Sequence, residues 1–110
     1  MDNKKLMPEV LIRVRFYLTE EGGRKHEIDT TYGEYHATLC IDGEYFDCRS
    51  WGNEPQVYKL GEWYNILIKF LSPELALPHF INGKLFTLWE GKTIAEGFVD
   101  KVLMESDQQV

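Results

Sequence analysis

Five side chains of the types that ligate metal ions are the first chemical feature of the sequence. They are His26, His36, His79, Cys40 and Cys48. Structural zinc sites usually draw their ligands from closely spaced pairs such as CxxC and HxxxH, and the chain contains neither pattern. We therefore expect no bound metal and no cofactor.

Catalytic motifs are the second possibility. The chain has no GxSxG elbow to present a serine nucleophile and no HExxH segment to build a metalloprotease site. It also lacks the GxxxxGK[ST] loop that cradles phosphates, which excludes a P-loop nucleotide site. Acidic residues are numerous, but they fall mostly on expected turns, where carboxylates are usually solvated. We expect no catalytic residues, and an enzyme of unrecognised type is the third-ranked hypothesis.

Aromatic side chains could instead form a binding surface. They are Trp51, Trp63 and Trp89 with Tyr32, Tyr35, Tyr45, Tyr58 and Tyr64. An exposed cluster of them would suit a protein-binding hot spot or a platform on which bases stack. The alternative is that they fill a β-rich core, where aromatic residues are also favoured.

Composition limits the class of protein and of partner. The 110 residues are 44% hydrophobic, enough for one domain with a real core, and the net charge is −6. Nucleic-acid binders usually carry a basic face, so an acidic total disfavours RNA as the main partner. No apolar run has the length of a signal peptide or a membrane span, and there are two cysteines. We expect a cytoplasmic protein that does not bind membranes.

Periodicity predicts β-strands throughout. From Val10 to Tyr17 apolar residues alternate with Arg13 and Arg15, the period of a half-buried strand. Further strands are expected at 34–41, 44–48, 57–60, 63–71, 84–90 and 93–103, with Gly97 marking a bulge or a close approach of backbones. Pro73 and Pro78 should keep regular structure out of 72–82. We expect one domain (1–110) with a core at about 10–103, a loose leader (1–8), a polar tail (104–110) and no helix.

Two turns can be described in more detail. Leu18 to Lys25 forms a charged turn in which two acids precede a glycine pair and two bases follow it. Asp42-Gly43 predicts a two-residue hairpin in which Ile41 opposes Glu44. That register places Cys40 and Cys48 on opposite faces and so predicts no disulfide; a three-residue loop would reverse it.

The EEGGR sequence of the charged turn and the closing segment 85–103 (LFTLWEGKTIAEGFVDKVL) together resemble the third domain of elongation factor Tu. That family carries an EEGGR turn after its first strand and ends in a hairpin similar to REGGRTVGAGVVTKIL. Leu60-Gly61-Glu62 resembles the family's MPGD turn, and Pro73 its proline after the central strand. The resemblance spans residues 10–103 and implies a six-stranded antiparallel closed Greek-key β-barrel, here as a stand-alone domain without an active site.

The family's domain also helps to hold the T-stem of aminoacyl-tRNA, but several of its RNA-facing positions differ here. Arg24 matches the turn arginine, whereas Lys25 replaces a histidine and Trp89 replaces the arginine of REGG. Ser72 replaces a basic residue, and Tyr35 lies near the position of a glutamine. The resemblance therefore favours the fold over the tRNA function.

The resemblance would bring the charged turn and the turn at Glu90-Gly91 to one side of the barrel, so it supplies the candidate partner-binding residues. They are Arg24, Lys25, Tyr35, Trp89, Glu90 and Gly91. The preferred hypothesis is a non-catalytic protein-binding module, either an inhibitor or immunity-type protein whose acidic surface steers a basic partner or a mimic of a translation factor. The alternative is a translation accessory that binds tRNA weakly.

Overall fold

The alternating segment near the start of the chain forms strand β1 (Val10–Phe16) in the computed structural model, which describes residues 7–104. Val10, Ile12, Val14 and Phe16 are at most 2% exposed. The residues between them are half-buried, so the period of two divides the strand into a core face and an outer face, as predicted.

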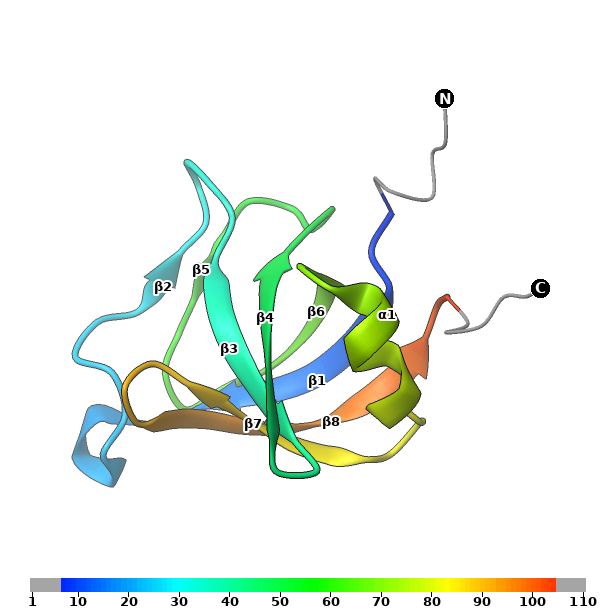
Figure 1. The fold of residues 1–110 in the computed structure, drawn as a ribbon. Coiled ribbons are helices and arrows are strands. Elements are labelled where there is room, and N and C mark those ends of the chain that lie inside the picture. The colour runs from blue at the N-terminus through cyan, green and yellow to red at the C-terminus, as the bar shows by residue number, and fades with distance from the viewer. Residues whose placement is uncertain (1–6, 105–110) are drawn as a thin grey trace.

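Six antiparallel strands close into a barrel in the order β1-β6-β4-β3-β7-β8, with β8 pairing back onto β1 (Figure 1). The other five are β3 (His36–Ile41), β4 (Glu44–Ser50), β6 (Trp63–Phe70), β7 (Leu85–Trp89) and β8 (Thr93–Val102). Strands β3, β4 and β6 follow one another along the chain and lie side by side in the barrel. The chain's first strand, β1, lies beside β6 rather than beside β3, and this arrangement is a Greek key. The predicted six-stranded antiparallel closed barrel is confirmed.

The β3–β4 hairpin has the predicted register. Ile41 pairs with Glu44, and Asp42 and Gly43 both take positive φ, 55° and 74°. Cys48 faces the core and Cys40 lies half-buried on the opposite face; both are free thiols, as the register predicted.

The expectation that no helix would form is wrong. A single helical turn, α1 (Pro73–Ala76), and a 3₁₀ turn (Leu77–His79) follow β6 and lie against the barrel (Figure 1). Pro73 occupies the first turn of its helix, where a missing N–H costs nothing because no intrahelical acceptor is available there. Prolines that rule out a strand can therefore start a short helix. The side chains of Ala76 and Leu77, at the end of that helix, are buried in the core.

The remaining elements are small. Strands β2 (Ile28–Asp29) and β5 (Val57–Tyr58) form a separate two-stranded sheet. β5 lies within the strand expected at 57–60, whereas β2 lies outside the strands expected from the sequence. Within residues 7–104 no helix has the length and hydrophobicity to cross a bilayer. The predicted leader (1–8) and tail (104–110) fall almost entirely outside the described residues.

Candidate functional site

The charged turn is held in one conformation by its glycines. Gly22 takes a positive φ of 94°, which favours glycine. A Cβ on Gly23 would lie 2.3 Å from the carbonyl oxygen of Tyr17, a distance that would be a steric clash. The hydroxyl of Thr19 donates to the carbonyl oxygen of Arg24 at 2.6 Å. These contacts fix the backbone of Arg24, which leaves the turn toward the β7–β8 connection.

Three of the six predicted site residues meet there. Arg24 Nε lies 3.4 Å from one carboxylate oxygen of Glu90, and the hydroxyl of Tyr35 donates to the other. The Arg24 guanidinium also lies 5.7 Å from the centre of the Tyr35 ring. Burial, followed by the hydrogen bond to Glu90, raises the pKa of Tyr35 above its ordinary value. The cluster therefore holds the Glu90 carboxylate in place as an internal brace between two turns.

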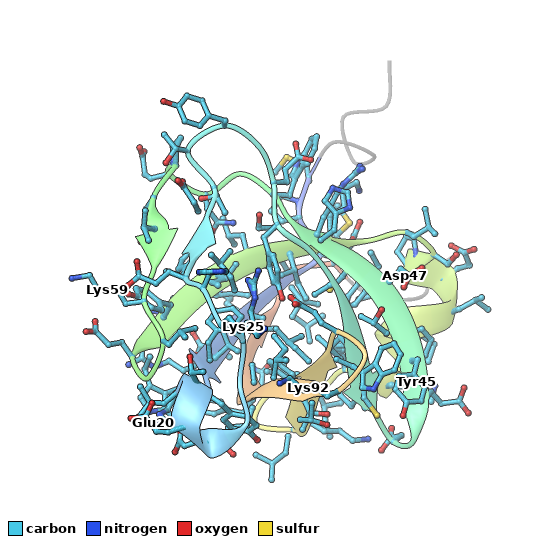
Figure 2. All side chains as sticks on the ribbon, turned by 90° about the vertical axis from the view of Figure 1, so that its left-hand side faces the viewer. Glu20, Lys25, Tyr45, Asp47, Lys59 and Lys92 are labelled. Atoms are coloured by element: carbon cyan, nitrogen blue, oxygen red, sulfur yellow. The ribbon has the colours of Figure 1, made fainter. Side chains whose placement is uncertain are left out.

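The other three predicted residues have different surroundings. Trp89 is 42% exposed and contacts Tyr45 edge-on, with ring centres 6.0 Å apart. Gly91 takes φ 75° and turns the chain into β8. Lys25 is exposed, and Figure 2 shows it on the face of the molecule that also carries Lys92, Tyr45 and Asp47.

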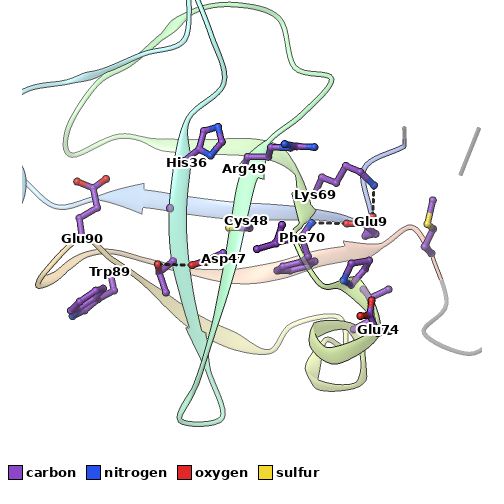
Figure 3. A pocket seen from close by; sticks show the side chains of 16 residues that line it. Glu9, His36, Asp47, Cys48, Arg49, Lys69, Phe70, Glu74, Trp89 and Glu90 are labelled. Carbon is purple, nitrogen blue, oxygen red and sulfur yellow. Dashed lines mark hydrogen bonds and ion pairs between the residues drawn. The ribbon is translucent and has the colours of Figure 1, made fainter. Parts of the chain in front are cut away.

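A groove of about 870 Å³ begins at Trp89 and Glu90 and extends across β3 and β4 toward α1 (Figure 3). The apolar part of its lining includes Ala37, Cys48 and Phe70. Its polar part includes carboxylates and bases from strands β3, β4 and β6 and from α1, together with one carboxylate just before β1 and one just after β7. Its volume lies within the usual range for binding sites. Of the six predicted partner-binding residues, Trp89 and Glu90 line this groove; the sequence did not predict the groove itself.

A buried ion pair lies in the groove wall. Glu9 is 1% exposed; one of its carboxylate oxygens lies 2.8 Å from Lys69 Nζ, and the other accepts the Phe70 N–H at 2.7 Å. Lys69 also donates to the carbonyl oxygen of Met7 at 3.3 Å. No sequence pattern predicts this pair, because the two residues are 60 positions apart.

No protein-family model matches the chain, and no curated protein matches it significantly. The geometry of the groove and the turn cluster therefore carries the functional argument.

The metal-ligand candidates do not converge. Among residues 7–104, no three His, Cys, Asp or Glu side chains are arranged to hold a metal ion. His79 Nδ1 instead lies 2.9 Å from Asp42, which also accepts from Lys84 at 2.6 Å. These hydrogen bonds, first from Lys84 and then from His79, lower the pKa of Asp42 and join the hairpin tip to the segment before β7.

The two thiols should react at very different rates. Burial raises the pKa of Cys48 to about 12, so at about pH 8 almost none of it is the reactive thiolate. We expect 5,5′-dithiobis(2-nitrobenzoate) to label one thiol of the native protein quickly and the second only after unfolding in guanidinium. The Cys40→Ser variant should lose the fast phase. Two fast thiols in the native protein would show that the groove exposes Cys48.

Proposed function

We propose that this barrel is a non-catalytic protein-binding module that holds its partner along the groove between Trp89 and α1. The observation that carries the proposal is the exposed aromatic pair at one end of an apolar-lined groove. Tyr45 is 61% exposed and contacts Trp89, which lines the groove. Tryptophan and tyrosine dominate protein-binding hot spots because they bury large areas at a small cost in conformational entropy.

The turn cluster supports the same site. Glu90 lines the groove next to Trp89, and its carboxylate is braced by Arg24 and Tyr35. A side chain whose position is fixed before binding loses less entropy when a partner contacts it. Four of the six predicted residues thus contribute to the groove end or its support, whereas Lys25 and Gly91 do not line it.

We further infer that the chain is a relative of the third domain of elongation factor Tu. The closed Greek-key barrel and the EEGGR turn are consistent with this ancestry. The tRNA-binding alternative requires Arg24 to contact phosphate, yet its guanidinium pairs with Glu90 through Nε, lies over the Tyr35 ring, and has its Nη1 buried away from solvent. Together with the net charge of −6, this favours a protein partner over RNA.

The Trp89→Ala variant tests the proposal. We expect wild-type barrel, immobilised at physiological salt, to retain a protein partner from a lysate of its own cells. Trp89→Ala should weaken that capture by at least about tenfold, the loss typical of a hot-spot tryptophan. Quantitative mass spectrometry of the eluates makes the comparison.

Trp63 provides a matched control, because it is 41% exposed and lies on β6, outside the groove lining. Trp63→Ala should leave the capture unchanged. Equal capture by wild type and Trp89→Ala, or recovery of nucleic acid alone, would contradict the proposal.

A further inference from the structure

Three basic side chains lie in one row across the groove. His36 on β3 pairs with Arg49 on β4, and Arg49 pairs in turn with Lys69 on β6. Directly opposed residues of antiparallel strands project from the same face. All three line the groove, and Figure 3 shows them along one edge of it.

Arg49 is the member of the row that is prepared to bind an anion. Its guanidinium lies over the Trp51 ring, 4.8 Å from the ring centre, and this cation–π contact restricts its position. Among the described residues, no carboxylate lies within ion-pair distance of Arg49. Arg49 is half-buried, and its guanidinium has paired N–H donors that match the two oxygens of a carboxylate.

The neighbouring charges show what kind of anion fits. Lys69 is held by Glu9, and His36 Nε2 lies 3.8 Å from Glu34, so the row offers one unpaired strong cation rather than three. Asp47 and Glu74 line the same groove. A single carboxylate can be accepted at Arg49, whereas a nucleic-acid backbone would bring several phosphates against these acids.

We propose that Arg49 receives one carboxylate, an aspartate or glutamate side chain in an extended segment of the partner protein, while an apolar side chain of the same segment packs on Trp89. This inference rests on the proposed function of the groove. Trp89 pairs with Thr38, and Arg49 pairs with His36, two residues along the same strand. Two strand spacings and two residues separate their Cα atoms by about 12 Å, the length of three or four residues of extended chain.

A peptide library tests the spacing directly. We would select phage-displayed random 12-residue peptides on the immobilised wild-type barrel and measure the affinities of the enriched peptides by fluorescence anisotropy. We expect them to share one Asp or Glu three or four positions from an aromatic or aliphatic residue. Runs of acids should be absent, because the net charge of −6 opposes them.

Substitutions then assign the carboxylate contact. Arg49→Gln should weaken a selected peptide by about tenfold or more, the usual loss for a charge-assisted hydrogen bond. Replacing the acidic residue of the peptide by its amide should weaken binding to the wild-type barrel by a similar factor. The same replacement should have little effect on binding to the Arg49→Gln variant. The matched control is Arg13→Gln, because Arg13 also lies over a tryptophan ring, Trp63 at 5.9 Å, and does not line the groove.

The possible failures separate the two proposals. Peptides without an acid that still depend on Trp89 would overturn the carboxylate inference and leave the groove as a protein-binding site. If no peptide is enriched, the inference of an extended segment with a carboxylate fails, and the capture experiment with Trp89→Ala alone decides the proposed function. Arg49-dependent binding of a single-stranded RNA oligonucleotide would replace the carboxylate by phosphate and overturn the choice of a protein segment.

Discussion

Replacing Lys69 by methionine should lower the free energy of unfolding by about 3 to 5 kcal/mol, because it leaves the Glu9 carboxylate buried without its partner. The Glu9 side chain is 2% exposed and that of Lys69 is 11% exposed, so little water can replace the lost ammonium group. Methionine retains most of the aliphatic length of lysine, which limits any loss of packing. Urea denaturation at neutral pH measures the change.

The double variant Glu9→Gln/Lys69→Met shows whether the uncompensated charge is the cause. Glutamine can still accept the N–H of Phe70 through its amide oxygen, the contact that Glu9 makes at 2.7 Å. The double variant should therefore be more stable than Lys69→Met alone. If both unfold at the same urea concentration, the cost comes from packing and our explanation is wrong.

Replacing Gly97 by alanine should cost about 3 kcal/mol or more, toward the upper end of the usual range for overpacking. A Cβ at this position would lie 2.2 Å from the carbonyl oxygen of Arg13 and 3.0 Å from the Cα of Val14. Both atoms belong to the backbone of β1, which is hydrogen-bonded on both sides and cannot move away cheaply. Thermal and urea unfolding of the variant measure the loss.

Gly33→Ala is the control for this substitution. A Cβ there has no neighbour within 4 Å, and Gly33 does not take a positive φ, so the change should be nearly neutral. A Gly97→Ala variant as stable as Gly33→Ala would show that β1 and β8 separate more easily than their pairing suggests.

Local patterns were sufficient to predict most of the barrel. The alternation in β1 and the Asp42-Gly43 turn each specify which face of a strand is buried, and both predictions hold. Gly97 was predicted to mark either a bulge or a close approach of backbones, and the neighbouring carbonyl of Arg13 shows that it is a close approach. The alternation and the turn depend on residues that are close in sequence. Gly97 could be predicted because a glycine that interrupts a strand pattern usually marks a bulge or a nearby backbone.

The groove could not be predicted in the same way, because it depends on which strands become neighbours. Arg49 and Lys69 are each an ordinary outward-facing base, and only the pairing of β4 with β6 places them in one row. The helix α1 was missed because prolines were interpreted only as breakers of regular structure. Lys25 is the opposite case, since its place beside Arg24 in the sequence did not bring it into the groove.

The seam between β1 and β8 joins the first and last strands of the barrel, since Val10 pairs with Val102. Contacts between such distant positions raise the contact order, and folds of this kind form slowly because a long loop must close first. A nascent chain still on the ribosome cannot complete this seam until β8 has emerged. Until then β1 can pair with β6 on one edge, but its other edge has no partner and is open to pairing with other chains.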